Sequence, residues 1–328
     1  MLSRTEVILL FALLVLIIFV PVAGATTGEL HEAPTNPDFI KYIEENQSGL
    51  TVVGTQSLGL APSPISRPDV LDVQLFGPAA GEPAASYPVT FDLRTYGKVS
   101  PVKNQDPWGT CWAFATFGSL ESTLMPAAPI PNFSEINLVN LAGFDFPIPD
   151  GGGNLWMSTA YLVRWNGPVD DATDPYPKHS WTSSRTHPPV KHVQNVVFLP
   201  ARSNRTDTGN IKGALTRWGA VSTALYWYEI FYNETHTSYY QPASDTGVDH
   251  GHWVTIIGWD DTYEATNFNT TADGPGAWLV KNSWGAEWGS EGCFYVSYYD
   301  KSIGSAIQPS GTYHNLSLIH ISEPTRPY

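Results

Sequence analysis

The sequence contains little cysteine: Cys111 and Cys293 are the only two in 328 residues. Two cysteines cannot build a disulfide framework, so a packed core must stabilise the fold. No group of cysteines and histidines has the spacing of a metal site, and Gly151-Gly152-Gly153 lacks the lysine and hydroxyl residue of a phosphate-binding loop. We therefore expect no metal and no cofactor.

Basic residues are also scarce. The chain has 17 Lys and Arg against 31 Asp and Glu, which gives a net charge of −14 and a pI near 4.9. Such acidity argues against nucleic acid or an anionic membrane as a partner. The hydrophobic content of 42% is sufficient for a sizeable core in one or two domains. We expect a monomer.

Long apolar runs are confined to the N-terminus. Arg4 precedes an apolar run from Val7 to Val20, and Ala23-Gly24-Ala25 fits an A-x-A cleavage site, so residues 1–25 read as a signal peptide. An uncleaved anchor is the alternative, but the run is shorter than the roughly 20 residues that span a bilayer. We expect a secreted, extracellular protein, with attachment to the cell surface left open. Glycosylation sequons occur at Asn46, Asn132, Asn204, Asn233 and Asn269.

Residues 26–86 differ in composition from the rest of the chain, because they are rich in Pro, Ala and Gly. They contain one amphipathic helix, predicted from Pro37 to Asn46, and then the extended segment GLAPSPISRPDV. We interpret residues 26–86 as a pro-segment or N-terminal arm, with a simple linker as the alternative.

The remaining pattern is helical first and strand-like afterwards, which predicts an α+β fold. Helices are expected at 112–125, 134–143, 154–165 and 211–218, with Ser134 as an N-cap. β-branched and aromatic runs at 252–260, 276–284 and 292–300 favour an antiparallel sheet or barrel. The polar loop 261–275 has an expected flexible tip at 267–273. A cleft between the two halves is the natural place for chemistry.

Cys111 lies in the first turn of the helix whose apolar segment is 112–125, soon after the turn formers Asp106, Pro107 and Gly109. The helix N-terminus favours a thiolate there, although a lone cysteine is more often a small buried residue. His252 follows 141 residues later and Asn282 another 30 residues on. A histidine can activate a thiol, and an asparagine amide can orient that histidine. The spacing therefore favours nucleophilic catalysis by Cys111.

The sequence resembles the papain-like cysteine peptidases over residues 88–300. The resemblance is carried in order by VSPVKNQDPWGTCWAFA, SEINLVNL, GGNLWMSTAYLVRWNG, IKGALTRWGAVSTALY, GHWVTIIGWDD and LVKNSWGAEWG. It implies a helical left subdomain and a β-barrel-like right subdomain, with the active site in the cleft between them. It also implies a peptidase domain over residues 87–312 that hydrolyses peptide bonds in polypeptide substrates.

The resemblance assigns a role to each matching residue. Cys111 is the nucleophile, His252 its general base and acid, and Asn282 the group that orients His252. The Gln105 side chain and the Cys111 backbone N–H form the oxyanion hole. The resemblance also implies substrate-binding positions. Gly152 and Gly153 offer backbone hydrogen bonds to a peptide, Trp284 covers the His252–Asn282 contact, and Trp288 lines the leaving-group side of the cleft.

Two histidines compete for the role of base, because His250 and His252 lie on the same face of a strand. The family's histidine stands six residues before the glycine of its G-W pair, which here is Gly258. That spacing selects His252 and leaves His250 as a polar neighbour.

The cysteines that usually form a disulfide beside the nucleophile are missing. Trp108, Leu141 and Asp150 stand near their positions, so the chain resembles secreted archaeal and bacterial members that lack the usual disulfides. We expect Trp108 to fill the space, packing alone to hold the loop, and Cys293 to be a buried apolar residue. Residues 313–328 read as a truncated or artefactual tail, because SLIHISEPTRPY resembles translated adapter sequence.

The sequence thus predicts a secreted cysteine endopeptidase. One alternative is a catalytically weak or inactive protein of the cell surface that binds peptides or glycans through a papain-like domain. Exopeptidase or transpeptidase action by the same residues is a further alternative, which depends on loops that the sequence does not place.

Overall fold

The computed structural model describes residues 36–45, 52–53, 56–62, 86–143, 152–176, 182–246, 250–304 and 316–320. The predicted signal peptide lies outside these residues. The described elements belong to one compact unit, which begins at Thr35. Among the described residues, no helix is both long enough and apolar enough to cross a membrane.

Three helices form the helical lobe: α3 (Cys111–Leu124), α4 (Glu135–Leu141) and α5 (Leu155–Val163). Side chains cap two of them, since Ser134 Oγ accepts the Asn137 N–H and Asn154 Oδ1 accepts the N–H groups of Trp156 and Met157. These caps fix where α4 and α5 begin, and Ser134 confirms the predicted N-cap.

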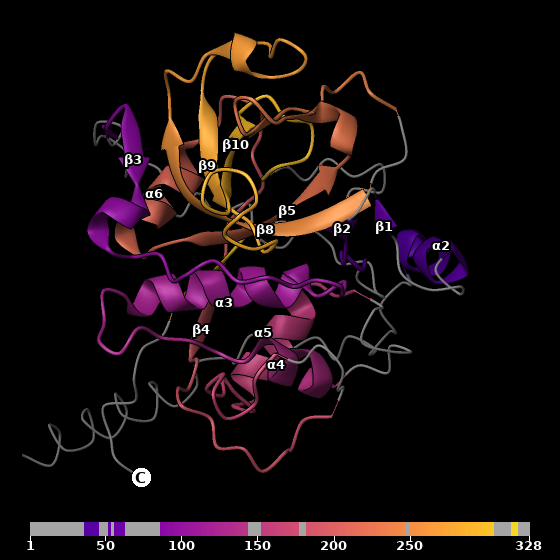
Figure 1. Ribbon diagram of the computed structural model, residues 1–328, viewed down its shortest axis with the longest axis vertical. Helices are drawn as coiled ribbons and strands as arrows, with labels where there is room; N and C mark the ends of the chain where they lie inside the picture. The colour runs from indigo at the N-terminus through magenta and orange to yellow at the C-terminus, as the bar shows by residue number, and fades with distance from the viewer. Residues whose placement is uncertain are drawn as a thin grey trace, which may run out of the picture. The chain divides into compact units, whose positions relative to one another are not determined.

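Helix α3 is buried on every side along most of its length, because it lies between the sheet and the other two helices (Figure 1). Gly118 permits the closest approach. A Cβ at this position would lie 2.8 Å from Thr255 Oγ1 on β8 (His250–Asp260). A helix this close to the sheet holds its first residue, Cys111, at the boundary between the two lobes.

The β lobe is built around four antiparallel strands in the order β5 (Val221–Trp227), β8, β9 (Ala277–Lys281) and β10 (Cys293–Ser297). The full order is β4-β11-β5-β8-β9-β10-β7-β6, with β3 paired to β8. The shorter strands are β3 (Thr90–Asp92), β4 (Asn195–Phe198), β6 (Tyr232–Asn233), β7 (Ser238–Tyr239) and β11 (Leu316–His320). Helix α6 (Gly209–Arg217) packs on this lobe.

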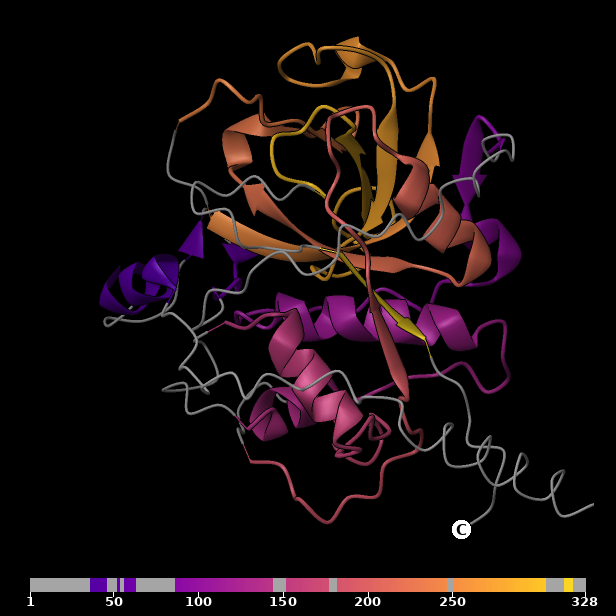
Figure 2. The ribbon, with the colours of Figure 1, turned by 180° about the vertical axis from the view of Figure 1, so that it is seen from behind.

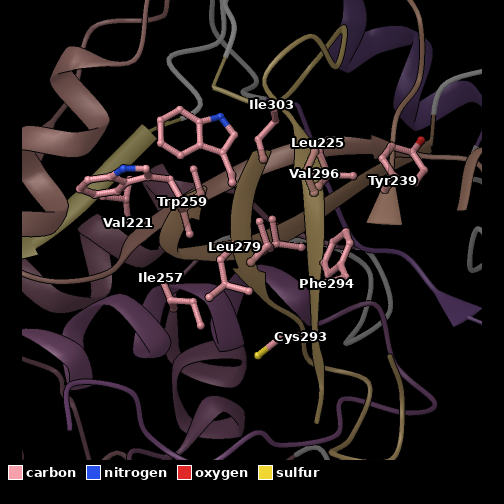
Figure 3. Packing of buried hydrophobic residues seen from close by; sticks show 14 of the residues in the cluster. Val221, Leu225, Tyr239, Ile257, Trp259, Leu279, Cys293, Phe294, Val296 and Ile303 are labelled. Atoms are coloured by element: carbon pink, nitrogen blue, oxygen red, sulfur yellow. The ribbon is translucent and has the colours of Figure 1, made fainter. Parts of the chain in front are cut away.

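A large apolar core fills the β lobe (Figure 3). Leu225, Trp259 and Phe294 are each at most 1% exposed, and Cys293 packs among them at 2%. Cys293 is therefore the buried apolar residue that the sequence predicted, and neither cysteine forms a disulfide.

The remaining elements are short. Helix α2 (Pro37–Glu45) and the hairpin of β1 (Val52–Val53) and β2 (Gln56–Ser57) precede the two lobes in the chain. Three 3₁₀ helices connect larger elements: η1 (Leu93–Tyr96), η2 (Glu229–Phe231) and η3 (Ala265–Asn267). Strand β11, yellow in Figure 2, comes from the predicted tail and pairs with β4 and β5.

The predicted α+β class is confirmed, with corrections to particular elements. Strand β9 ends at Lys281, so Asn282 lies just beyond the strand. The loop tip expected to be flexible is packed instead: Phe268 and Ala272 are buried against Tyr240. The Asn269 side-chain amide also donates to the carbonyls of Ile230 and Tyr232, at 3.2 and 2.7 Å.

Candidate active site

Cys111 is the first residue of α3 and is fully buried. Its Sγ accepts the backbone N–H of Trp253 at 3.4 Å. Trp253 directly follows His252 on β8, so this bond ties the thiol to the strand that carries the histidine. Helix α3 and strand β8 therefore bring together two residues that are 141 positions apart.

His252 and Asn282 form a hydrogen bond of 2.8 Å between Nε2 and Oδ1. The same Oδ1 accepts the backbone N–H of Ser283 at 2.8 Å, which identifies this atom as the oxygen of the amide. Since a carbonyl oxygen only accepts, the imidazole must carry its proton on Nε2. His252 Nδ1 is then the basic nitrogen, and it is buried without a hydrogen-bond partner among the described residues.

Trp284 lies over the histidine. Its ring is stacked on the His252 imidazole with centroids 4.6 Å apart and an interplanar angle of 20°. Trp227 and Trp288 each meet Trp284 edge-on at 4.9 Å, and Trp288 also contacts Phe294. This aromatic cluster leaves Trp284 only 6% exposed, so water is excluded from that face of the imidazole.

Gln105 is held at both its backbone and its side chain. Its N–H donates to the Ser283 carbonyl at 2.8 Å, and Ser283 Oγ donates to Gln105 Oε1 at 2.6 Å. One N–H of the amide donates to the Trp108 carbonyl at 2.9 Å, so the side chain is held at its nitrogen as well as its oxygen. Ser283 therefore joins Gln105 to the Asn282 side of the site, a role that the sequence reasoning missed although Ser283 stands next to Asn282.

The chain's own residues 58–62 lie along Gly153. Gly153 donates to the Gly59 carbonyl at 2.8 Å and accepts from Ala61 N–H at 3.0 Å, and Leu60 pairs with Gly153 in parallel. From the other lobe, the Gly251 carbonyl accepts Leu60 N–H at 3.2 Å. The backbone of an extended peptide is thus bound from both lobes.

Gly59 contacts the loop that precedes the nucleophile. A Cβ at this position would lie 1.9 Å from the Gly109 carbonyl oxygen, so only glycine fits without movement of the backbone. Gly59 N–H also hydrogen-bonds the Cys111 thiol. Gly152, in the left-handed region at φ 67°, packs directly on Gly59, since a Cβ on Gly152 would lie 2.8 Å from the Gly59 oxygen.

Burial is the largest influence on the ionisation of the site. Desolvation raises the pKa of Cys111 to about 12, although four backbone N–H groups act in the opposite direction. Desolvation also lowers the pKa of His252 to about 4, against a smaller opposing effect of the Asn282 hydrogen bond. The thiolate expected at the helix N-terminus is therefore wrong for this covered state, because loss of water outweighs the helix dipole.

A buried polar layer lies behind the site. Lys103 Nζ contacts both carboxylate oxygens of Glu135 at 2.8 and 2.9 Å, and lies 4.0 Å from Glu121. Ser100 Oγ donates to Glu121 at 2.5 Å and accepts from Lys281 Nζ at 2.9 Å. Since Lys281 precedes Asn282 in the chain, these charges connect α3 and α4 to the strand that leads to the site.

The structure also shows where most of the other predicted positions lie. Trp108 is half-buried in the loop before α3, and Trp288 is half-buried in the aromatic cluster. His250 starts β8 opposite Trp227, and the ring that pairs with the Asn282 oxygen is that of His252. Asp150 lies outside the described residues. Within those residues, no group of three or more His, Cys, Asp or Glu side chains could hold a metal ion.

Taken together, these features define a two-lobed α+β protein with a thiol, an imidazole and an amide at the boundary between the lobes. The sequence model described as "Papain family cysteine protease" matches residues 87–312. The chain belongs to that family.

Curated relatives include human cathepsin L2, which is 30% identical over 249 residues, covering 70% of this chain and 66% of the relative. A cathepsin L-like peptidase of Aedes aegypti is 31% identical over 225 residues, covering 64% of this chain and 59% of the relative. The chain therefore spans less than two thirds of the length of these relatives.

Two solved structures are also similar. One contains the cysteine protease and lectin-like domains of Cwp84, a surface layer associated protein of Clostridium difficile. Its TM-score is 0.67 at 26% identity, over 90% of this chain and 61% of that chain. The other is the bromelain protease from Ananas comosus in complex with the E64 inhibitor, with a TM-score of 0.55 at 24% identity, over 72% and 100%. The second likeness concerns the fold alone.

Proposed function

We propose that this protein is a secreted cysteine endopeptidase. His252 Nδ1 removes the proton from the Cys111 thiol, and Sγ attacks the carbonyl carbon of a peptide bond. The peptide nitrogen leaves with the proton from His252, and an acyl-enzyme remains as a thioester. Water, deprotonated by His252, then attacks the thioester and releases the acid and the thiol.

Two further sets of residues assist these steps. The Gln105 side-chain N–H and the Cys111 backbone N–H are the donors to the negative oxygen of each tetrahedral intermediate. Asn282 orients His252, and Trp284 covers their contact. The observation that carries the proposal is the 2.8 Å bond between His252 Nε2 and Asn282 Oδ1, because it leaves Nδ1 as the basic nitrogen.

The test uses two single substitutions. Cys111→Ala should abolish both peptide hydrolysis and labelling by a thiol-directed peptidyl epoxide. The matched control, Cys293→Ala, should retain both, since Cys293 is buried in the core of the β lobe. Undiminished labelling of Cys111→Ala would move the nucleophile to Cys293. Peptide binding without cleavage by the wild type would favour the alternative of an inactive binding protein.

Residues 58–62 support a second part of the proposal, in which the N-terminal segment inhibits the enzyme until it is displaced. With the segment in place, Cys111 and His252 are fully buried, and desolvation raises the pKa of the Cys111 thiol to about 12. A neutral thiol is a poor nucleophile, and a peptide that already binds Gly153 blocks a substrate from the same hydrogen bonds.

Gly59→Ala tests this inhibition, because its Cβ collides with the backbone of Gly109. The full-length variant should react with iodoacetamide at least tenfold faster than the wild type near pH 7, since displacement of the segment lowers the thiol pKa. Gly209→Ala is the matched control, because no atom lies within 4 Å of the Cβ position there. Equal alkylation rates in wild type and Gly59→Ala would contradict inhibition by the segment.

The expected setting is extracellular, with polypeptides as substrates and no nucleic acid or membrane partner. The N-terminal apolar run and the acidic composition support it. Among the described sequon asparagines, Asn132, Asn204 and Asn269 are exposed and so are open to glycosylation. The Asn269 amide also donates to two backbone carbonyls. A shift in gel mobility after treatment of secreted protein with a glycosidase would test their use.

A further inference from the structure

Tyr176 contacts both ends of the loop that carries the predicted oxyanion donors. Its hydroxyl donates to the Gln105 carbonyl at 2.8 Å and lies 2.7 Å from Thr110 Oγ1. Its ring meets Phe114 of α3 edge-on, with centroids 5.0 Å apart. One side chain thus touches the first residue of the loop, the last residue of the loop and the helix that comes after it.

The directions of these hydrogen bonds follow from the chemistry of the groups. A tyrosine hydroxyl has one proton, and the Gln105 carbonyl can only accept, so that proton goes to Gln105. The Thr110 hydroxyl must then donate to the Tyr176 oxygen. The two bonds form a chain, Thr110 to Tyr176 to Gln105, in which each partner is fixed.

Thr110 is available for this chain because it does not cap its own helix. It is the N-cap residue of α3, yet its side chain makes no capping hydrogen bond. A threonine at an N-cap normally accepts an N–H from the first helical turn. Here the hydroxyl is fully buried and directed to Tyr176 instead. This use of Thr110 fixes the residue that immediately precedes Cys111.

We propose that Tyr176 is a positioning residue that sets the distance between the two oxyanion donors, the Gln105 side chain and the Cys111 backbone N–H. The inference rests on the proposed peptidase function. It also replaces the expectation from the sequence that packing alone holds this loop, because Tyr176 is hydrogen-bonded to both of its ends. Donors to an oxyanion are effective only when they are held in place before the charge develops.

The test compares Tyr176→Phe with wild type in the full chain, incubated in reducing buffer until turnover of a fluorogenic peptide is constant. Active sites are titrated with a peptidyl epoxide. We expect kcat to fall about tenfold with KM within about twofold, less than the roughly 10²–10³-fold cost of losing an oxyanion donor. Affinity for a peptide aldehyde, which binds as an oxyanion-like adduct, should fall by the same factor.

Alkylation by iodoacetamide distinguishes positioning from general loosening. This displacement forms no oxyanion, so its rate at Cys111 should stay within about twofold in Tyr176→Phe. Tyr263→Phe is the matched control, since Tyr263 also donates one hydrogen bond to a backbone carbonyl, that of His236, at 3.1 Å. The control should change none of the three measurements.

A second pair of variants tests the same chain of hydrogen bonds at Thr110. These variants also provide a test if Tyr176→Phe does not fold. Thr110→Val should reproduce the loss in kcat, Thr110→Ser should restore it, and the double variant with Tyr176→Phe should be no worse than the poorer single variant. Unchanged kcat and aldehyde affinity in active Tyr176→Phe would overturn the inference alone, as would an equal fall in alkylation. A wild type that titrates with the epoxide but hydrolyses no peptide would overturn the proposed function and this inference together.

Discussion

The two sides of the active site are held by different forces. On the nucleophile side, Ser283 and Tyr176 donate hydrogen bonds to Gln105, and Thr110 donates one to Tyr176. On the histidine side, Trp284 is held by ring contacts with Trp227 and other aromatic residues. Hydrogen bonds specify direction and distance, whereas ring packing chiefly excludes water and adds stability.

The difference arises from what each side must do. An oxyanion hole needs donors aimed at one point, so it depends on directed bonds. The imidazole has one directed bond, to Asn282, and that bond must be kept dry. The aromatic cluster serves this purpose at a cost: Trp284 Nε1 and Asn282 Nδ2 are buried and have no hydrogen-bond partner among the described residues. Substitutions on the two sides should therefore affect different quantities.

Trp284→Ala should have the largest effect, mainly on stability. Removing a buried tryptophan from a packed cluster costs about 3–5 kcal/mol, because transfer and cavity terms add. The loss also wets the His252–Asn282 bond, so kcat should fall as well. Urea unfolding and peptide turnover measure the two effects. Trp284→Phe should recover most of the stability, and a stable Trp284→Ala variant would show that packing does not hold the histidine side.

Asn282→Ala should affect activity more than stability. Without the amide, His252 loses the bond that fixes its tautomer and ring orientation, and general acid–base catalysis contributes typically 10²–10⁴-fold. We expect kcat/KM to fall about 10²-fold, equivalent to about 2.7 kcal/mol. Asn269→Ala is the control, since Asn269 hydrogen-bonds two backbone carbonyls elsewhere in the β lobe. A loss of stability as large as the loss of activity would place Asn282 among structural residues.

The sequence predicted the catalytic residues better than the residues that hold them in place. Cys111, His252 and Asn282 stand in recognisable motifs, and the strand and helix patterns around them are strong. Tyr176 lies in no motif, and its contacts are with residues 66 and 71 positions away, so only the folded chain reveals them. The raised thiol pKa was unpredictable for the same reason, because it follows from the complete burial of Cys111 in the folded chain.

The polar layer behind the site offers the smallest and most specific prediction. Burial raises the pKa of Glu135 to about 7 from an ordinary value of 4.5, while Lys103 lowers it and Glu121 raises it further. Between pH 4.5 and 7 the native state therefore binds more protons here than the unfolded state. Stability from this group is fully present below pH 4.5 and is lost as the pH rises through about 7.

Glu135→Gln removes this titration and leaves the other groups in place. His252 acts in the opposite direction, since its lowered pKa makes stability rise with pH, but it is common to both chains and cancels in their difference. The free energy of unfolding of wild type minus that of Glu135→Gln should fall by on the order of 2 kcal/mol between pH 4.5 and 7.5. Urea unfolding at one-unit pH steps measures it.

Added salt provides a control for this last experiment. Glu135 is 2% exposed, so 0.5 M NaCl should leave the pH dependence almost unchanged, whereas an effect of surface charges would be screened. Parallel stability curves for the two chains would show that the carboxylate is ionised throughout this range. The comparison of the two sides would then change, because a fully ionised layer of Lys103, Glu121 and Glu135 would lie behind the site. Buried charges of this kind must be closely paired, whereas an apolar cluster has no such requirement.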